Sequence, residues 1–289
     1  MREMFWVRPG YESVLAALGL DSLDAVFAWS AGQRMDKPGL EGWRQRWRIT
    51  LPDGLGYGYL KRFTHPPFRR QAQRWLSGAG RLSTAGIEWR NARQLADAGI
   101  AAAEPIAFGQ EMAGVWERRS FILLGEVAGQ SLERWLPVHL PAAERDPYKQ
   151  ARRKRLDRLA HFVARFHHAG FVHRDLYLSH IFMDAAGADE AGEGKFRLID
   201  LQRVFRPRWR RRRWVVKDLA ALNFSTPPER VSARERTHFI CRYVRDCGYG
   251  GSVRRLVKDV EIKMRFIARR HERPRADERD GQRDQYNEV

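Results

Sequence analysis

The stretch of sequence that decides the fold reads Phe171-Val-His-Arg-Asp-Leu-Tyr-Leu-Ser-His-Ile-Phe-Met183. It contains His173-Arg174-Asp175 and, five residues after this aspartate, His180. A second acidic residue, Asp200, ends a strand-like apolar run that begins at Phe196. A shorter apolar run, Ile181 to Met183, follows His180, and a turn-rich segment at residues 185–194 separates it from the run that begins at Phe196. A hairpin could therefore bring Asp175, His180 and Asp200 together.

This arrangement is typical of kinase catalytic loops. They read H-R-D-x-x-x-x-N and are followed by a metal-binding aspartate after a strand. The first three letters match here, and His180 stands where the asparagine would. The alternative is a buried His-Arg-Asp ion-pair cluster in an ordinary core, because short motifs often match by chance. Asp200, at the expected kind of position, favours a phosphotransferase.

A lysine inside an apolar strand points the same way. Residues 43–51 alternate bulky and polar side chains, and residues 56–63, which contain Lys61, form the expected partner strand. A buried lysine needs a partner. Glu88, in the first turn of a helix predicted over residues 87–99, could reach Lys61. The alternative is an edge-strand lysine that faces water.

The remaining pattern predicts an α+β molecule with two lobes. Two more strands, in residues 100–109 and 120–125, would complete a small antiparallel sheet, after which Glu126 and Val127 begin the crossing to a second lobe. We expect an N-terminal lobe at 1–127, a mainly helical lobe at 128–270 and a flexible tail at 271–289. The clearest helix spans residues 152–168, and the basic run at its start reads as a solvated face.

Composition excludes several classes of protein. The 289 residues are 43% hydrophobic, so the chain is not disordered, and no apolar run is long enough to span a membrane. The N-terminus lacks the apolar core of a signal peptide. The two cysteines, Cys241 and Cys247, form neither a disulfide framework nor a metal site, and a reducing cytosol fits this usage.

The net charge of +18 is unevenly distributed. Residues 1–127 carry a net +4 and residues 128–289 a net +14. Such a field attracts nucleic acid, anionic lipid or a phosphorylated glycolipid. Residues 203–214 alone hold seven arginines among aromatic side chains, and residues 66–83 repeat the pattern more weakly. A solvated basic surface is the alternative for both segments.

Taken together, six segments resemble the lipopolysaccharide kinase family, the bacterial Kdo and heptose kinases of the lipid A–core region. The resemblance covers roughly residues 42–270, and a histidine at the position of His180 is usual in that family. The chain departs from protein kinases in having neither a glycine-rich loop of their kind nor an Ala-Pro-Glu segment, and Gln202 replaces a histidine common in relatives. The segments are 60–62, 88–90, 121–124, 173–177 with His180, 198–203 and 216–222.

The resemblance implies a protein-kinase-like fold and an enzyme that uses ATP and Mg²⁺ to phosphorylate a sugar hydroxyl of the lipopolysaccharide inner core. Asp175 would accept or orient the proton of the hydroxyl, and Asp200 and His180 would hold Mg²⁺. The implied nucleotide contacts are Lys61, Glu88, Glu126 and Val127. The implied substrate contacts are Arg174, Arg203, Arg206 and Arg208.

The implied acceptor is an anionic glycolipid, and the implied location is the cytoplasm, at the inner leaflet of the cytoplasmic membrane. Nucleic acid is the less favoured partner, and no oligomeric state is predicted. Two other interpretations are open. One is a different small-molecule kinase of the same superfold, of the aminoglycoside or choline type. The other is a non-catalytic basic adaptor for nucleic acid or membrane.

Overall fold

The computed structural model describes residues 2–35, 42–76, 80–139, 149–184 and 195–272. The chain divides into two compact units. Unit 1 consists of Met1–Gln130 and Ile181–Phe205, and unit 2 consists of Ser131–His180 and Arg206–Val289. The tail predicted at 271–289 lies almost wholly outside the described residues.

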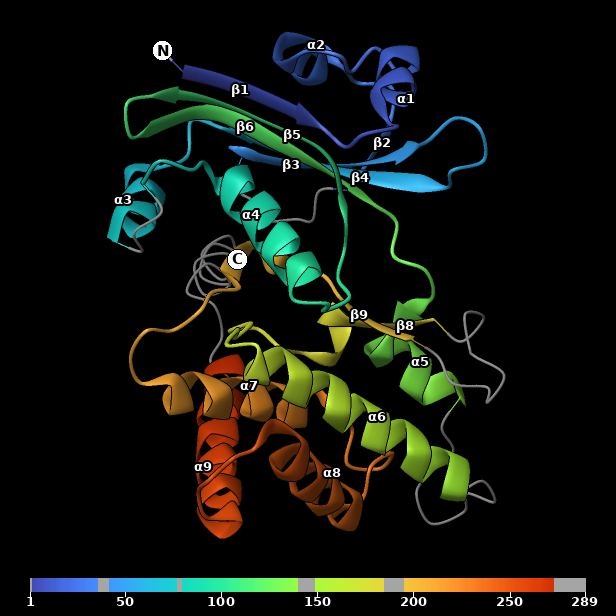
Figure 1. Ribbon diagram of the computed structural model, residues 1–289, viewed down its shortest axis with the longest axis vertical. Helices are drawn as coiled ribbons and strands as arrows, with labels where there is room; N and C mark the ends of the chain where they lie inside the picture. The colour runs from blue at the N-terminus through green and yellow to red at the C-terminus, as the bar shows by residue number, and fades with distance from the viewer. Residues whose placement is uncertain (1, 36–41, 77–79, 140–148, 185–194, 273–289) are drawn as a thin grey trace, which may run out of the picture. The chain divides into compact units, whose positions relative to one another are not determined.

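Unit 1 is built on an antiparallel six-stranded sheet (Figure 1), and its strand order is β1-β5-β6-β4-β3-β2. Four of the strands overlap the predicted runs, although β5 begins five residues later and β6 four residues earlier than predicted. Strands β1 and β2, in the weakly patterned N-terminal part, were not predicted. The strands are β1 (Arg2–Val7), β2 (Gln33–Arg34), β3 (Arg44–Thr50), β4 (Tyr57–Thr64), β5 (Pro105–Ala113) and β6 (Trp116–Gly125).

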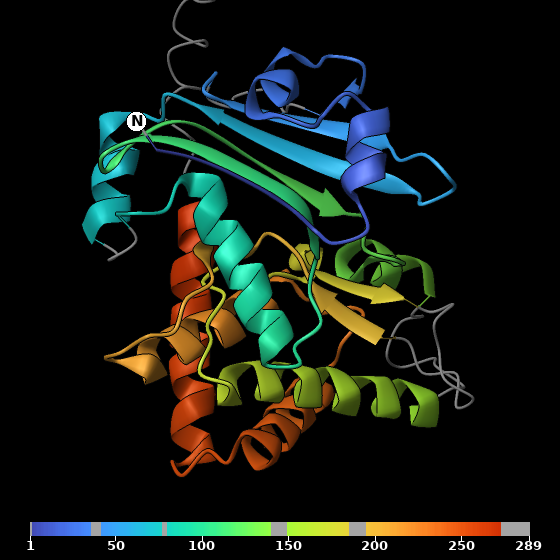
Figure 2. The ribbon, with the colours of Figure 1, turned by 45° about the horizontal axis from the view of Figure 1, so that its top comes forward.

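Helices cover both faces of this sheet. Helices α1 (Glu12–Ala17) and α2 (Leu23–Ala28) lie on one face, and α4 (Thr84–Asp97) crosses the other (Figures 1 and 2). Strand β6 alternates accordingly, since Phe121 and Leu123 pack with α1 and α2 while Ile122 and Leu124 pack on the side of α4. Helix α4 begins three residues earlier than predicted, because Ser83 caps it by accepting from the Gly86 N–H.

A short sheet, β7-β8-β9, carries the segment before Asp200. Its strands are β7 (Gln130–Ser131), β8 (Ile181–Asp184) and β9 (Lys195–Leu198). Ile181 pairs with Leu198 in antiparallel register, so the predicted hairpin is present. A bridge between Ala102 and Leu198 joins β9 to the loop before β5.

Unit 2 is helical. Helix α6 (Lys149–His168) packs on α8 (Ala233–Cys247), and α7 (Arg211–Ser225) packs on α9 (Val253–His271). The other elements are α5 (Leu132–His139) and the 3-10 turn η2 (Leu178–His180). The predicted α+β class is confirmed. Within the described ranges, no helix has both the length and the apolarity needed to cross a bilayer.

The prediction of a solvated basic face at the start of α6 is wrong for Arg152. Its side chain is buried, and it donates to the Glu235 carboxylate and to the Arg230 carbonyl. Glu235 also completes a capping box with Ser232 at the start of α8. Arg152 therefore attaches α6 to the first turn of α8. This role could not be predicted from the sequence, because Arg152 is one of four consecutive cationic residues.

Candidate active site

Lys61 and Glu88 form a buried ion pair in unit 1. The Lys61 Nζ lies 2.6 Å from the Glu88 Oε1, and the Glu88 side chain is 1% exposed. The alternation of β4 turns Lys61 toward α4, and the first turns of that helix present Glu88. The predicted pair is therefore present. A charge-assisted hydrogen bond compensates for the burial of the carboxylate and fixes the ammonium on the sheet.

Asp200 lies close to this pair. It follows β9 with a left-handed backbone (φ 56°, ψ 60°), and its Oδ1 is 3.9 Å from the Lys61 Nζ. The side chain is partly exposed, at 38%. A left-handed non-glycine residue costs conformational energy and commonly marks a functional position. Unit 1 thus brings Lys61, Glu88 and Asp200 together.

The turn after Asp200 is held from two sides. Asn91 of α4 donates from Nδ2 to the carbonyls of Leu201 and Val204, at 2.8 and 2.7 Å. Gln202 accepts a hydrogen bond of 2.7 Å from Arg44 of β3. Helix α4 and the sheet therefore both position the 3-10 turn η3 (Leu201–Arg203) that follows Asp200.

In unit 2, Asp218 of α7 clamps the backbone just before Asp175. Its Oδ2 accepts from the His173 N–H at 2.6 Å, and its Oδ1 accepts from the Arg174 N–H at 2.7 Å. Asp218 is fully buried, with the His167 Nε2 3.3 Å from its Oδ2. Two backbone donors and a buried acceptor hold the loop in one conformation, in which Arg174 has a positive φ of 71°. Asp175 is presented by a rigid loop.

Lys217, the neighbour of Asp218 on α7, reaches the Asp175 carboxylate. The Lys217 Nζ lies 3.6 Å from the Asp175 Oδ1, and both side chains are roughly one-fifth exposed. Sequence reasoning noted this segment only as part of the resemblance and assigned no role to Lys217 or Asp218. The signal was available, since two charged residues interrupt an apolar helical run and buried charges require partners.

His180, the last residue of η2, is fixed by the same loop. Its Nδ1 is 2.7 Å from the backbone carbonyl oxygen of Asp175. A carbonyl can only accept, so Nδ1 carries the proton and the lone pair of the neutral ring is on Nε2. A hydrogen bond of this kind is what commonly orients a metal-binding histidine. The ring also stacks on His173, at a centroid distance of 5.6 Å.

The remaining predicted residues lie as follows. The Glu126 N–H donates to the Tyr57 carbonyl at 2.9 Å, and Val127 packs against the core on the α4 side of the sheet. The Arg174 guanidinium lies 5.2 Å from the Trp214 ring centroid, and that of Arg206 lies 4.2 Å from the Phe171 ring centroid. Arg203 and Arg208 are exposed.

Donor atoms suited to a divalent cation are present in each unit. Unit 1 offers the carboxylate of Asp200, and unit 2 offers the Nε2 of His180 and the carboxylate of Asp175. Among the described residues, no group of three or more His, Cys, Asp and Glu side chains is arranged to hold a metal ion. Mg²⁺ typically takes only one or two protein ligands, with oxygen donors preferred, and completes its shell with phosphate oxygens and water. The carboxylates of Asp200 in unit 1 and of Asp175 in unit 2 are donors of this kind.

Several known proteins resemble this chain in sequence or in fold. The model of the lipopolysaccharide kinase (Kdo/WaaP) family matches residues 59–243, which include every residue of the candidate site. The lipopolysaccharide core heptose(I) kinase WaaP of Pseudomonas aeruginosa is 30% identical over 207 residues, 71% of this chain and 75% of that protein. The enzyme of the same name from Escherichia coli K12 is 30% identical over 157 residues, 54% of this chain and 58% of its own length.

Among solved structures, WaaP in complex with acyl carrier protein superimposes with a TM-score of 0.66 at 24% identity, over 93% of this chain and 98% of that one. This likeness confirms the predicted kinase-like fold. The family match, the relatives and the fold together identify this chain as a member of the lipopolysaccharide kinase (Kdo/WaaP) family, as its sequence predicts.

Proposed function

We propose that this chain is an ATP- and Mg²⁺-dependent kinase that phosphorylates a hydroxyl of a heptose or Kdo in the lipopolysaccharide inner core. The observation that carries the proposal is the clamped loop that presents Asp175 beside Lys217, in a chain of this family. The relatives from Pseudomonas aeruginosa and Escherichia coli are core heptose kinases, which favours heptose as the acceptor.

Asp175 acts as the residue that orients the acceptor hydroxyl and takes its proton. Phosphoryl transfer requires mainly positioning and charge neutralisation, so a carboxylate fixed by its backbone is well suited to hold the attacking oxygen in line. The Lys217 ammonium, 3.6 Å from the Asp175 Oδ1, helps to fix that carboxylate and adds positive charge where the phosphoryl group is transferred.

Lys61 binds the ATP phosphates and is held for this task by Glu88. Asp200 of unit 1 and the Nε2 of His180 of unit 2 would be the protein ligands of Mg²⁺, which would neutralise charge on the transferring phosphoryl group. Backbone groups of Glu126 and Val127 meet the adenine ring. The left-handed backbone of Asp200 and the hydrogen bond from His180 to the Asp175 carbonyl support these two ligand assignments.

The basic segment at residues 203–214, which belongs to unit 2 from Arg206 onward, serves an anionic acceptor. Arg203 and Arg208 are exposed and can form bidentate contacts with phosphate, while Arg174 and Arg206 are steadied by aromatic rings. The core glycolipid is anchored in a membrane, so the enzyme works in the cytoplasm at the inner leaflet. The net +14 of residues 128–289 supports this location, because anionic lipids attract basic surfaces.

Mass spectrometry tests the proposal directly. Purified core glycolipid that lacks the modification is incubated with the chain, ATP and Mg²⁺, and we expect a mass gain of one phosphate. The matched control is Asp175→Asn, which should give no detectable product in the same time. A panel of aminoglycosides and choline, assayed with labelled ATP, covers the other kinase class. Transfer to a panel member and none to the core glycolipid would refute the assignment.

A further inference from the structure

Helix α3 (Phe68–Leu76) in unit 1 buries polar side chains and exposes large apolar ones. Its buried side chains are polar, since Gln71 and Arg74 are each 5% exposed. Two large apolar side chains are exposed instead, Phe68 at 67% and Leu76 at 89%. Surface helices of globular proteins normally bury the apolar stripe and expose the polar one.

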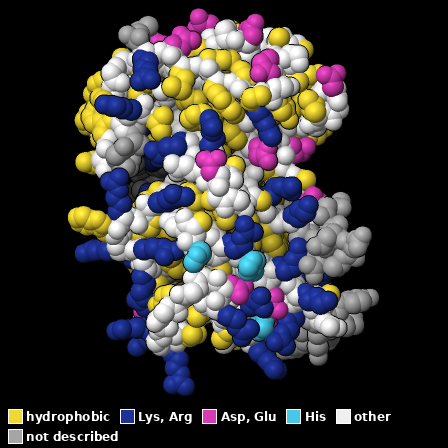
Figure 3. All heavy atoms as spheres, viewed as in Figure 1, with side chains coloured by type: hydrophobic (Ala, Val, Ile, Leu, Met, Phe, Trp, Pro, Cys, Tyr) yellow, Lys and Arg dark blue, Asp and Glu magenta, His cyan; other side chains and the backbone are white. Residues whose placement is uncertain are grey.

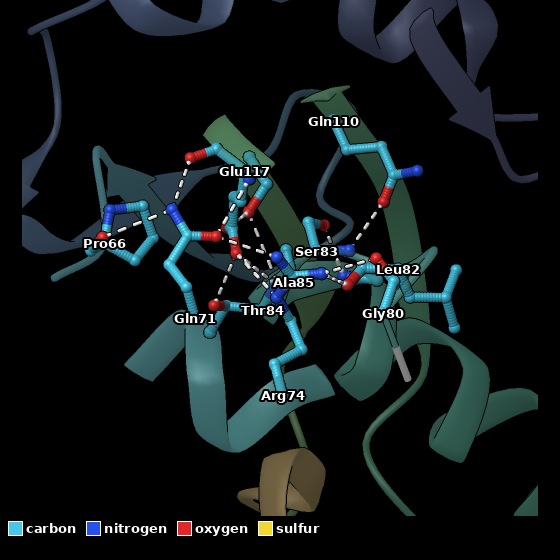
Figure 4. A network of polar contacts seen from close by, with 12 residues as sticks. Pro66, Gln71, Arg74, Gly80, Leu82, Ser83, Thr84, Ala85, Gln110 and Glu117 are labelled. Atoms are coloured by element: carbon cyan, nitrogen blue, oxygen red, sulfur yellow. Dashed lines mark hydrogen bonds and ion pairs between the residues drawn. The ribbon is translucent and has the colours of Figure 1, made fainter. Parts of the chain in front are cut away.

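Hydrogen bonds rather than apolar packing hold this helix in place. The Arg74 guanidinium donates to the carbonyls of Gly80, Leu82 and Val115 at 2.6–2.9 Å, and to the side-chain oxygen of Gln71 at 2.8 Å (Figure 4). A buried guanidinium with this many acceptors fixes orientation strongly, because each donor would be costly to leave unsatisfied.

Gln71 supplies the second attachment. Its amide nitrogen donates to the carbonyls of Pro66 and Glu117, and its oxygen accepts from the Glu117 N–H (Figure 4). The helix is thus bound to the β5–β6 hairpin through Gln71 and Arg74, and Phe68 and Leu76 are left exposed beside Arg69 and Arg70.

The tip of the β5–β6 hairpin adds to these exposed apolar side chains. Val115 is 45% exposed and Trp116 is 42% exposed. Ring centroids of Trp75 and Trp116 are 4.5 Å apart, and the Phe68 ring lies within 6.3 Å of both. The Trp75 Nε1 donates to the Val115 carbonyl at 3.0 Å. We call the five residues Phe68, Trp75, Leu76, Val115 and Trp116 the aromatic platform.

Positive charge surrounds the aromatic platform. From residue 54 to residue 87 the sequence contains no Asp or Glu, while Arg69, Arg70 and Arg81 are all exposed. Arg118, on β6 like Trp116, has a side chain that is half exposed and lies 3.8 Å from the Glu111 carboxylate. In Figure 3, hydrophobic side chains reach the surface where Figure 1 draws α3, with Lys and Arg side chains nearby. This charge disfavours a second copy of the chain as the occupant and favours an anionic one.

We propose that the aromatic platform with Arg69 and Arg70 is a docking surface for an anionic lipid bilayer. Tryptophan and phenylalanine partition to the level of the headgroups, and flanking arginines bind anionic lipid, which is the composition found here. The inference deepens the proposed action on a membrane glycolipid, and it differs from the basic segment of unit 2 in residues and in chemistry.

Vesicle co-sedimentation tests the inference without nucleotide or acceptor, so its outcome does not depend on the proposed kinase activity. The probes are vesicles of phosphatidylcholine with and without phosphatidylglycerol. We expect the wild type to bind the anionic vesicles, and Phe68→Ser/Leu76→Ser to lose about tenfold or more in affinity. Arg69→Gln/Arg70→Gln should lose roughly ten- to thirtyfold on anionic vesicles alone.

The control is Ile262→Ser/Phe266→Ser on α9, which also removes two exposed apolar side chains (56% and 59% exposed). The control should bind like the wild type, and thermal melting should show all variants folded. Wild-type binding by the Phe68/Leu76 variant, or an equal loss in the α9 control, would overturn the inference. A loss confined to Trp209→Ser, in the basic segment of unit 2, would also overturn it, as would a platform variant that loses affinity for DNA but not for vesicles.

Discussion

Asn91 ties the helix that carries Glu88 to the turn that follows Asp200. Its Nδ2 donates to the Leu201 carbonyl at 2.8 Å, and Asn91 lies one helical turn after Glu88 on the same buried side of α4. One helix therefore positions both the lysine that we assign to ATP and the aspartate that we assign to Mg²⁺. A change in the position of α4 would disturb both groups at once.

Asn91→Ala should lower stability and turnover together. The substitution leaves the Leu201 and Val204 carbonyls without this donor, at a cost of about 1–3 kcal/mol. Because the turn after Asp200 is loosened, we expect kcat to fall by about tenfold or more. Thermal melting and steady-state kinetics measure the two effects. Asp97→Ala, at the exposed end of the same helix, is the control and should change stability by less than about 0.5 kcal/mol. A wild-type kcat in Asn91→Ala would show that the turn holds its position without it.

Asp218→Asn should impair catalysis more than nucleotide binding. The carboxylate accepts from two backbone N–H groups, whereas an amide offers one oxygen and turns its NH₂ toward the other donor. We expect a loss of about 1–3 kcal/mol in stability and a fall of about a hundredfold or more in kcat, with little change in KM for ATP. Equal effects on kcat and on ATP binding would argue against a role confined to the loop of Asp175.

Asp175→Asn should reduce turnover by orders of magnitude and leave the fold intact, because the side chain is partly exposed and nearly isosteric with its replacement. Lys217→Met should reduce kcat by about ten- to a hundredfold, and Lys217→Arg should recover part of that loss by restoring the positive charge. Single-turnover transfer to core glycolipid measures both. Transfer by Asp175→Asn at near wild-type rate would defeat the assignment of the base.

Asp200→Ala should abolish the gain in nucleotide affinity that Mg²⁺ provides. The carboxylate is the proposed metal ligand from unit 1, and removing it should lower the affinity for Mg-ATP by about tenfold or more, with less effect on ATP in the presence of a chelator. Calorimetry with and without Mg²⁺ measures the difference. Binding that is unchanged in the presence of Mg²⁺ would exclude Asp200 from the metal site.

Much of the fold was predictable because its periodic signals are local. The strand that contains Lys61, the helix that contains Glu88 and the hairpin before Asp200 all bury apolar residues at regular spacing, and all are present. The family assignment followed from motifs near these elements. By contrast, α3 buries Gln71 and Arg74, so no apolar period marks it as a helix, and the sequence shows there only a segment rich in arginine.

The site was predictable only in part, for a related reason. Asp175 and His180 lie in a recognisable motif, but Asp218 and Lys217 act on that motif from more than forty residues away. Their roles depend on the packing of α7 beside the loop, and that packing cannot be predicted from a single sequence. The charges within an apolar helix indicated that partners existed but not which residues they were.

Glu117 gives a pH-dependent prediction that concerns the first turn of α4. Its buried carboxylate accepts from the Thr84 N–H and hydroxyl at 2.8 Å each and from the Ser120 hydroxyl at 2.6 Å, beside Arg74 (Figure 4). Burial nevertheless raises the pKa of Glu117 above its ordinary value of 4.5, although these hydrogen bonds and the Arg74 charge act to lower it.

The direction of this shift sets the sign of the effect on stability. Between pH 4.5 and the raised pKa, the folded chain binds more protons at Glu117 than the unfolded chain does, so this contribution to stability falls as pH rises. Glu117→Gln keeps the shape of the side chain but cannot titrate. We therefore expect the Tm of the wild type minus that of Glu117→Gln to decrease steadily as pH is raised from 4.5. Other titrating groups are common to both proteins and cancel in the difference, so a constant or increasing difference would show that the pKa of Glu117 is not raised in the folded chain.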